Sequence, residues 1–432
     1  MTTRTADILV VGGGFAGVYA ARAAERRLKG RAVRIVLVAP DNFLLFSPLL
    51  PEAASGTIEP RHAVVPLREL LGSTELLSGQ VTSVDVAGHQ AEVCDIDGNL
   101  STVRYATLVL APGSEPMTAA IPGLQRYAVG FKTLADAIWL RNRVLHQLEA
   151  ASVATNQARR RRLLTFTFVG AGYAGVEALA ELESLAADVL PRYGGLRHDD
   201  FRWVLVEARD SLLPGLDPRL AAYTAKVLRA RGVEVRVGTR MTSCEDNEVV
   251  LSDPEVAPYQ SETIVWTAGQ RPSPLPAAAG LPLEGNGRVM VDDHLRVIGH
   301  PEVYALGDCA AVPDSGGGLC PPTAQHALRQ GLAAGRNVAA DHGVGQPVPF
   351  GYRTRGSAVT LGRGQGTAQV HRLLFTGWPA WWLGRAYHLY MIPGAARRTR
   401  VISDWALGLI FARDVAQLGA LGRPAPLKPP PE

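Results

Sequence analysis

The 432-residue chain has only four cysteines, and no two of them form a C-x-x-C pair. Cys94, Cys244, Cys309 and Cys320 are too scattered to predict a disulfide framework or a zinc site, so we expect no metal and a reducing compartment. Cys309 is expected to be a small buried residue rather than a reactive thiol.

Long apolar runs are also missing. No stretch approaches the roughly 18 to 20 apolar residues that a helix needs to cross a bilayer, so we expect no membrane-spanning segment. The opening MTTRTADILVVGGG changes from polar residues to a short apolar run and then to glycines, which does not predict a signal peptide. The chain could still lie on a membrane surface.

Charge of one sign is not abundant. Lysine and arginine number 44 against 40 acidic residues, and this small excess gives no reason to expect nucleic acid as a partner. The 47% hydrophobic and 19% charged residues are typical of a globular protein. The length predicts two or three domains.

What the sequence does contain is a glycine pattern near its start. Residues 8–11 form a continuous apolar run, as in a parallel strand buried on both faces. Gly12, Gly14 and Gly17 follow with G-x-G-x-x-G spacing, ahead of a helix-like segment, and residues 33–40 predict the next strand. Such glycines permit a tight turn, a close approach to a pyrophosphate and close helix packing. The helix N-terminus adds unpaired N–H groups for the phosphates.

The same pattern occurs a second time. Gly170, Gly172 and Gly175 follow TFTFV, and the next predicted strand, FRWVLVE, ends on Glu207. An acid at that position hydrogen-bonds a ribose 2′-hydroxyl and disfavours a 2′-phosphate, which indicates a preference for NADH. Arg209, two residues later, keeps NADPH open as the alternative.

The first copy departs from this pattern because Ala39 stands where the acid is expected. Asp41, Asn42 or the backbone would then contact the ribose. Two fingerprints imply two dinucleotides, unless both are ordinary glycine-rich turns of an α/β sheet. An enzyme that holds a flavin and a nicotinamide needs this arrangement, because the nicotinamide delivers a hydride and the flavin stores two electrons.

Further motifs lie outside the two fingerprints. They are TLVLAPGSEP at 107–116, TIVWTAGQRPSP at 263–274, PEVYALGDCA at 301–310, FSPLLPEAASG at 46–56 and CPPTAQHALRQG at 320–331. With these motifs, nearly the whole chain resembles the two-dinucleotide-binding-domain flavoproteins and, within them, the type II NADH:quinone oxidoreductases. The resemblance implies FAD and NADH as cofactors and a quinone as the acceptor.

The resemblance also implies roles for single residues. Asp308 would hydrogen-bond the ribityl chain of the flavin, and residues 46–56 would run beside the isoalloxazine. Residues 320–331 would place a helix N-terminus near the flavin ring and line the quinone site, with Gln325 and Gln330 matching glutamines of the family. Arg329 stands where the family more often has a further glutamine.

Glu177 lies two residues after Gly175, on the first turn of the second fingerprint helix. In the resembling family, a glutamate here sits between nicotinamide and flavin and handles protons during quinone reduction. A carboxyl in a water-poor pocket has a raised pKa, which suits proton delivery. The alternative is that Glu177 only complements the helix dipole.

We therefore expect Glu177 and Gln325 to be catalytic. The residues expected to bind the cofactors come from the same motifs and are Gly12, Gly14, Phe15, Ala16, Gly17, Asp41, Pro48, Ala111, Gly113, Asp308, Thr323, Ala324, Gln325, Gly170, Gly172, Tyr173, Ala174, Gly175, Glu207 and Gly269.

The C-terminal region has a different composition. Residues 353–370 alternate like short strands separated by glycines, and Trp378, Trp381, Trp382 and Trp405 are four of the seven tryptophans in the chain. Tryptophan, tyrosine and arginine on short apolar helices are typical of an interfacial membrane anchor. A homodimer interface or a lid on the flavin domain is the alternative. Asp404 is expected to N-cap the last helix.

These observations predict an α/β fold with two Rossmann-like domains, the second inserted in the first, followed by a C-terminal β-hairpin and amphipathic helices. The expected segments are 1–115 and 285–345 for the FAD domain, 116–284 for the NAD(P)H domain, 346–420 for the membrane or dimer region, and 421–432 for a disordered tail. The expected protein is a peripheral enzyme at the cytoplasmic face of the cell membrane that pumps no protons.

Three other functions remain open at this stage. A soluble NAD(P)H:acceptor oxidoreductase of the ferredoxin- or rubredoxin-reductase kind would not need the tryptophan-rich region. A sulfide:quinone-type enzyme would need a second cysteine to act with Cys320. A flavin-bound NADH sensor without turnover is the third, and the departures at Ala39 and Arg329 keep it open. Disulfide reductases are excluded because the first domain has no C-x-x-C pair.

Overall fold

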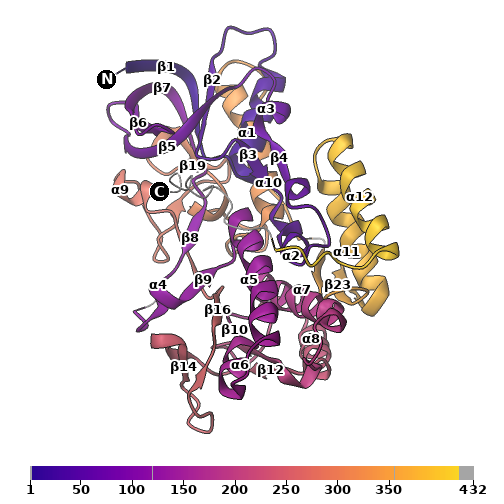
Figure 1. Ribbon diagram of the computed structural model, residues 1–432. Coiled ribbons are helices and arrows are strands. Elements are labelled where there is room, and N and C mark those ends of the chain that lie inside the picture. Colours follow the sequence, from indigo (N-terminus) through magenta and orange to yellow (C-terminus); the bar gives the residue numbers. More distant parts are fainter. Residues whose placement is uncertain (1, 119, 355, 418–432) are drawn as a thin grey trace, which may run out of the picture. The chain divides into compact units, whose positions relative to one another are not determined.

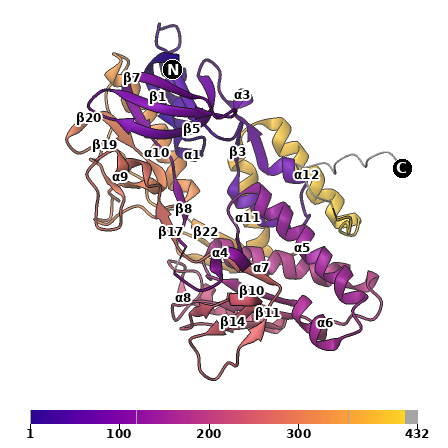
Figure 2. The same cartoon turned by 60° about the vertical axis from the view of Figure 1, so that its left-hand side comes forward.

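The computed structural model describes residues 2–118, 120–354 and 356–417. These residues form an α/β structure with two compact units (Figures 1 and 2). Unit 1 consists of Met1–Ser47, Val64–Met117 and Gly269–Arg355, and unit 2 consists of Pro48–Ala63, Thr118–Ala268 and Gly356–Glu432. The predicted α/β class, with a second domain inserted in the first, is confirmed. The finer boundaries stay predictions, and the expected tail at 421–432 lies outside the described residues.

Unit 1 is built on a seven-stranded sheet. Its strands are β1 (Thr2–Val11), β2 (Ile35–Ala39), β5 (Glu75–Asp85), β6 (Gln90–Asp95), β7 (Leu100–Leu110), β19 (Arg296–Val297) and β20 (His300–Ala305). Strands β20, β7, β1, β2 and β5 run parallel in that order, and β6 pairs antiparallel with both β5 and β7.

The apolar runs of the sequence explain the centre of this sheet. Ile8 of β1 lies between Ile35 of β2 and Thr107 of β7. The last four residues of β1 and all of β2 are buried. A strand covered on both faces must be apolar at consecutive positions, and both runs satisfy this requirement.

Helices α1 (Phe15–Arg27) and α10 (Ala324–Asp341) pack side by side in unit 1 (Figure 2). Their backbones are in direct contact because α10 has glycines at the crossing. A Cβ on Gly331 would lie 2.3 Å from the carbonyl oxygen of Ala16, and one on Gly335 would lie 2.3 Å from that of Ala20. Only glycine fits at these two positions.

Shorter elements complete unit 1. They are β3 (Phe43–Leu45), β4 (Val64–Pro66), α3 (Leu67–Leu70), β8 (Ser114–Pro116), β17 (Gln270–Pro272), α9 (Leu275–Ala278), β18 (Val289–Met290), η6 (Gly307–Cys309) and β21 (Ala310–Ala311). The turn η1 (Ser47–Leu49) lies where unit 1 gives way to unit 2.

Unit 2 contains a parallel five-stranded sheet, in the order β12-β11-β10-β16-β9. The strands are β9 (Ala128–Gly130), β10 (Thr165–Val169), β11 (Arg202–Val206), β12 (Val233–Arg236) and β16 (Thr263–Trp266). Strand β10 is buried at every residue, and Phe166 stacks on Trp203 of β11 with ring centroids 4.3 Å apart. This repeats the parallel strand, glycine loop and helix of unit 1.

Some helices of unit 2 begin at a capping side chain. Thr133 caps α5 (Leu134–Ser152) by accepting a hydrogen bond from the Asp136 N–H at 3.1 Å, and the Asp136 carboxylate accepts one from the Thr133 N–H. The other helices and turns are α2 (Leu50–Ala54), η2 (Pro60–Ala63), α4 (Leu124–Tyr127), α6 (Gln157–Leu163), α7 (Tyr173–Val189), η3 (Leu190–Arg192), η4 (His198–Asp200), α8 (Pro218–Ala230) and η5 (Glu245–Asn247). A small antiparallel sheet is formed by β13 (Met241–Ser243), β14 (Glu248–Leu251) and β15 (Tyr259–Gln260).

The C-terminal part of unit 2 is a three-stranded antiparallel sheet followed by two helices. The elements are β22 (Gly356–Thr360), β23 (Gly366–Val370), β24 (Leu373–Thr376), α11 (Gly377–Met391) and α12 (Ala395–Ile410). Among the described residues, no helix combines the length and the apolar character required to cross a membrane.

The prediction that Asp404 N-caps the last helix is wrong. Asp404 lies inside α12, which begins after Gly394 without a side-chain cap. Its carboxylate instead accepts a hydrogen bond from the Glu59 N–H at 3.1 Å and contacts Nδ1 of His62 at 2.5 Å. From the sequence alone, Asp404 is predicted to be the residue before the helix rather than a residue within it. In the structure its contacts connect α12 to the segment that follows α2.

Candidate functional site

The first glycine loop connects β1 to α1 in unit 1. Gly12 has φ +110°, and a Cβ there would lie 2.2 Å from the carbonyl oxygen of Ala111. A Cβ on Gly17 would lie 2.1 Å from the carbonyl oxygen of Gly12. A Cβ on Gly14 would meet no atom within 4 Å, and Gly14 precedes α1 without a side-chain cap. Gly12 and Gly17 therefore allow the tight turn, and Gly14 leaves room for a pyrophosphate at the helix N-terminus.

The neighbouring predicted residues lie around this loop. Phe15 and Ala16 form the first turn of α1, and Ala111 and Gly113 follow β7. Asp41 is exposed beyond the end of β2. Ala39 is fully buried, and its Cβ would lie 2.8 Å from a Cβ on Gly13.

The close approach of Ala39 explains why residue 13 is a glycine. Pro48 lies in η1, at the start of unit 2.

Asp308 lies in the turn η6 after β20, as the motif predicted. Its Oδ2 accepts a hydrogen bond from the Ser114 hydroxyl at 2.8 Å. The preceding residue, Gly307, donates its N–H to Oε1 of the buried Gln330 at 2.7 Å. Gln330 of α10 thus holds the turn that carries Asp308, a role that the sequence did not reveal.

Cys309 is the last residue of the same turn and is fully buried. Its Sγ donates to the carbonyl oxygen of Leu306 at 3.2 Å. Burial raises the pKa of the Cys309 thiol to about 12, and Asp308 adds to the rise. The thiolate is therefore absent near neutral pH, as expected of a structural cysteine.

Helix α10 begins at Ala324, and Thr323 is its N-cap. The Thr323 side chain accepts a hydrogen bond from the His326 N–H and also lies 2.8 Å from Nδ1 of His326. Ala324 and Gln325 form the first turn, where helix N–H groups and the positive dipole end can face a ligand.

The second glycine loop, in unit 2, has the same geometry as the first. Gly170 has φ +104°, and its Cβ would lie 2.7 Å from the N atom of Ala268. A Cβ on Gly175 would lie 2.0 Å from the carbonyl oxygen of Gly170, whereas one on Gly172 would meet nothing within 4 Å. Tyr173 and Ala174 begin α7. This loop fits a second pyrophosphate.

Glu207 follows β11 and binds the second glycine loop directly. Its Oε2 accepts the N–H of Ala171 at 2.7 Å, and its Oε1 accepts the N–H of Arg209 at 3.0 Å. The acid predicted to bind a ribose is thus fixed beside the loop. Gly269, predicted to bind a cofactor, has φ +82° and belongs to unit 1, where its carbonyl oxygen accepts the Met117 N–H at 3.2 Å.

Glu177 is buried on the first turns of α7, with 8% of its surface exposed. Its Oε1 accepts hydrogen bonds from the N–H of Thr360 at 2.8 Å and from the Thr360 hydroxyl at 3.2 Å. Desolvation raises the pKa of the Glu177 carboxyl to about 8, although the two Thr360 bonds oppose the rise. Glu181 and Glu52 raise it further through their charges. The side chain is therefore a neutral acid at pH 7.

Two more glutamates near Glu177 are buried, and sequence reasoning missed both. Glu181, one turn further along α7, is 1% exposed and pairs with Arg413 at 3.4 Å. Glu52 of α2 accepts hydrogen bonds from Nε of Arg385 at 3.1 Å and from the Trp405 indole at 2.6 Å. Burial raises the pKa of Glu52, and Arg385 opposes that rise. Acids at a helical spacing of four are common on exposed faces, so no sequence signal marked Glu181 as buried.

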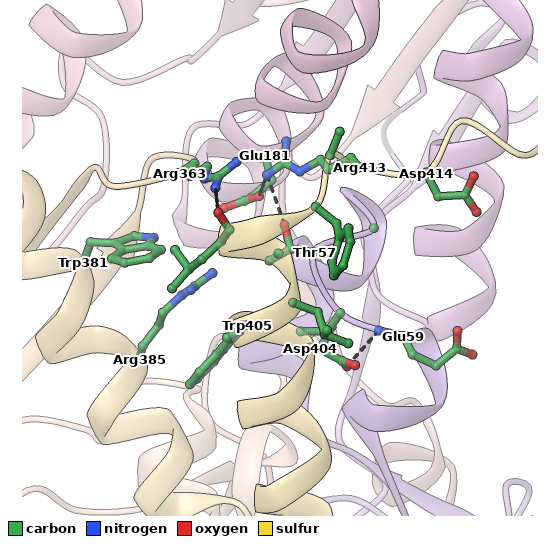
Figure 3. A pocket seen from close by; sticks show the side chains of 17 residues that line it. Thr57, Glu59, Glu181, Arg363, Trp381, Arg385, Asp404, Trp405, Arg413 and Asp414 are labelled. Atoms are coloured by element: carbon green, nitrogen blue, oxygen red, sulfur yellow. Dashed lines mark hydrogen bonds and ion pairs between the residues drawn. The ribbon is translucent and has the colours of Figure 1, made fainter.

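Arg385 lies between Trp381 and Trp405, with its guanidinium 3.9 and 4.6 Å from the two rings (Figure 3). These side chains form one wall of a cavity of about 200 Å³ within unit 2. Other parts of the wall come from Thr57, Glu181 and the end of α12. The four tryptophans that were predicted to form a surface anchor therefore differ in exposure. Trp381 and Trp405 are buried, whereas Trp378 and Trp382 are exposed.

A pair of glycine variants separates the two functions of the second loop. We expect Gly175→Ala to lower the free energy of unfolding by about 3 kcal/mol or more, because the new methyl overlaps the Gly170 carbonyl. We expect Gly172→Ala to leave stability unchanged and to weaken dinucleotide binding about tenfold, because its methyl fills only the open cradle. Thermal melting and equilibrium titration check the two effects. Equal destabilisation by both variants would contradict the cradle.

Comparison with known proteins places these features in a wider group. Residues 6–331 match the family model described as pyridine nucleotide-disulphide oxidoreductase. The chain is 31% identical over 421 residues to the type II NADH:quinone oxidoreductase Ndh of Mycobacterium tuberculosis, covering 94% of this chain and 88% of that protein. It is 29% identical to the demethylphylloquinone reductase NdbB of Synechocystis, covering 94% of this chain and 98% of the other.

A solved structure agrees on the fold. NDH2 from Plasmodium falciparum, determined in complex with NADH, superposes with a TM-score of 0.88 at 18% sequence identity. The match covers 96% of this chain and all of that one. At this identity the likeness establishes the shared architecture.

Proposed function

Because the chain belongs to the pyridine nucleotide-disulphide oxidoreductase family and, within it, to the type II NADH:quinone oxidoreductases, we propose that it oxidises NADH through bound FAD and reduces a quinone without pumping protons. The observation that carries the proposal is the presence of two glycine cradles, each open at its middle glycine. One cradle serves each dinucleotide.

In unit 1, the loop at Gly12–Gly17 would hold the FAD pyrophosphate, and Asp308 would accept hydrogen bonds from the ribityl chain. In unit 2, the loop at Gly170–Gly175 would hold the NADH pyrophosphate, and Glu207 would accept from the ribose hydroxyls. When bound, the flavin accepts a hydride from NADH and gives up two electrons to the acceptor.

Glu177 supplies a proton in this proposal. Its Oε1 already accepts two hydrogen bonds from Thr360, so the proton of the neutral acid resides on Oε2. A quinone that gains the two electrons and the hydrogen of a hydride needs one more proton to become a quinol, and a neutral acid near pH 7 is suited to deliver it. Glu177 and Gln325 are the residues we propose as catalytic.

The decisive experiment is anaerobic stopped-flow spectroscopy on the purified protein. NADH should bleach the flavin absorbance, and a short-chain quinone added afterwards should restore it. Bleaching without recovery would exclude a quinone as the acceptor and favour a protein partner. A flavin that NADH does not bleach would contradict the proposed enzymatic activity and favour a flavin-bound NADH sensor without turnover.

Exposed side chains of α11 and α12 support attachment to a membrane surface. Trp378, Trp382, Leu383 and Tyr390 are exposed on α11, and Leu407, Leu409, Ile410 and Phe411 are exposed at the end of α12 and just after it. We propose peripheral binding at the cytoplasmic face of the cell membrane. Co-sedimentation with anionic vesicles tests it, and a homodimer that covers these side chains is the alternative outcome.

The nucleotide preference can be changed at one residue. In Glu207→Gln, the amide oxygen can still accept the Ala171 N–H, but the negative charge that repels a 2′-phosphate is lost. We expect the ratio of kcat/KM for NADPH over NADH to rise about tenfold. The control Asp199→Asn removes a charge from a fully exposed acid and should not change the ratio. An unchanged ratio in Glu207→Gln would mean that another residue selects the nucleotide.

A further inference from the structure

The segment that follows α12 is held within unit 2 by arginine side chains. Residues 411–417 form neither a helix nor a strand. Arg192 of η3 donates from Nη1 to the backbone carbonyl of Arg413 at 2.7 Å. Arg141 of α5 donates two hydrogen bonds of 2.8 Å to further backbone carbonyls of the same segment. These bonds fasten the backbone at Arg413 and just after it.

The Arg413 side chain enters the interior of unit 2, where only 9% of it is exposed. Its Nη2 donates to Oγ1 of Thr57 at 3.0 Å and to Oε2 of Glu181 at 3.4 Å (Figure 3). Its Nη1 donates to Oγ of Ser184 at 3.1 Å and lies 3.3 Å from Oδ2 of Asp188. A guanidinium can only donate, so the direction of each of these bonds is certain.

Three of these partners share one face of α7 with Glu177. The row runs from Glu177 through Glu181 and Ser184 to Asp188, in steps of four, three and four residues. Arg413 contacts the last three members of the row. Along the helix, Glu181 therefore separates Glu177 from the other contacts that Arg413 makes with α7.

The charged groups around Glu177 are two other buried acids. Desolvation is the largest cause of the raised pKa of Glu177, and the charges of Glu181 and Glu52 add to it. Glu52, from α2, is paired with Arg385. Tyr173, on the same helix as Glu177, is a neutral phenol at pH 7 because burial raises its pKa. The ionisation of Glu181 therefore bears directly on Glu177.

Arg413 decides whether Glu181 carries a charge. The Glu181 side chain is 1% exposed, and a carboxyl buried to this extent takes up a proton when it has no cation, because a lone buried charge is costly. A further arginine nearby, Arg231, is already paired with Glu183. With Arg413 in place Glu181 stays ionised, and its charge disfavours a second negative charge on Glu177.

We propose that Arg413 is a positioning residue that keeps Glu181 ionised beside Glu177, and that this charge keeps the proton on Glu177 at neutral and mildly alkaline pH. The inference rests on the proposed function, in which Glu177 delivers a proton to the quinone. It adds no step to the reaction. It assigns to the segment after α12 the setting of the pH range over which the proton is available.

The test measures the rate of flavin reoxidation by a short-chain quinone as a function of pH in the full-length holoenzyme. In wild type this rate should fall as the pH rises through about 8. Glu181→Gln and Arg413→Gln should both move the fall by about one pH unit towards acid, because residue 181 is neutral in each. Arg413→Lys keeps the cation and should keep the wild-type position. Arg229→Gln, at an exposed arginine of α8, is the control.

Infrared spectroscopy provides a readout that does not depend on turnover. The carbonyl stretch of the protonated Glu177 carboxyl, identified by its loss in Glu177→Gln, should titrate near pH 8 in wild type and at lower pH in both variants. Arg413→Gln should also gain the band of a protonated Glu181. The double variant Glu181→Gln/Arg413→Gln should lack that band and should titrate as Glu181→Gln alone does.

The outcomes separate this inference from the proposed function. A fall that stays near pH 8 in either single variant, or a double variant that shifts further than Glu181→Gln, would overturn the inference while the proposed function stands. If Glu177→Gln retains the wild-type fall, the proposed proton donor is wrong, and the inference is wrong with it. Should Arg413→Gln fail to fold, Glu181→Gln still decides, because Arg413 then keeps its contacts with Ser184 and Asp188.

Discussion

Glu177→Gln is expected to slow flavin reoxidation by quinone about 100-fold, the loss typical of removing a general acid. Glutamine keeps the shape of the side chain and can still accept the Thr360 hydrogen bonds, but it cannot supply a proton. Flavin reduction by NADH should change little. Stopped-flow traces of the two half-reactions measure the two rates separately. Glu248→Gln, on an exposed residue of β14, is the matched control and should behave as wild type.

The pH dependence of the same step provides a second measurement. Because the pKa of Glu177 is raised to about 8, the proton-carrying form predominates below that pH and is lost above it. The wild-type rate of quinone reduction should therefore fall as the pH rises through about 8, and Glu177→Gln should lack this fall. An identical pH profile in the variant would assign the proton to another group.

The raised pKa also links Glu177 to stability. The folded state holds a proton on Glu177 up to about pH 8, whereas the carboxyl of the unfolded chain loses it near its ordinary value of 4.5. The stability that the raised pKa represents is therefore fully present below pH 4.5 and is lost as the pH rises towards 8. The difference in unfolding free energy between Glu177→Gln and wild type should grow across this window.

The second large effect is expected at the buried pair of Glu52 and Arg385. Arg385→Ala should lower the free energy of unfolding by about 3–5 kcal/mol, the usual cost of leaving one member of a buried ion pair alone. Both side chains are almost fully buried, at 4% and 6% exposure. The variant also removes the group that fills the space between Trp381 and Trp405. Urea unfolding measures the change.

Two further variants separate charge from packing at this pair. Arg363→Ala removes an exposed arginine from the wall of the same cavity and should change stability by less than about 0.5 kcal/mol. The double variant Glu52→Gln/Arg385→Met should recover most of the loss, because no unpaired charge remains buried. If the double variant is as unstable as Arg385→Ala, packing rather than charge is the dominant contribution.

The two nucleotide-binding folds were predictable because their signals are local. The strand before each loop, the three glycines and the helix after them lie within a short stretch, and the first and third glycine of each loop are required by clashes that the structure displays. Glu207 was predictable for the same reason, since it stands at the end of the strand that follows the glycine loop and its helix.

The partners of the buried carboxylates were not predictable because they are distant in sequence. Glu52 and Arg385 are 333 positions apart, and Glu177 finds Thr360 after 183. Composition assigned all the tryptophans of the C-terminal region to a surface, although two of them enclose Arg385. The prediction for Asp404 failed because capping chemistry is local and its real partners, at 59 and 62, are not.

The contact between α1 and α10 has a consequence for motion. At Gly331 and Gly335 the two helix backbones touch, with no side chain between them that could change rotamer. Neither helix can slide or rotate without losing this contact, so the loop before α1 and the turn before α10 keep a constant separation. The amide hydrogens at the crossing should exchange with solvent only when unit 1 unfolds as a whole.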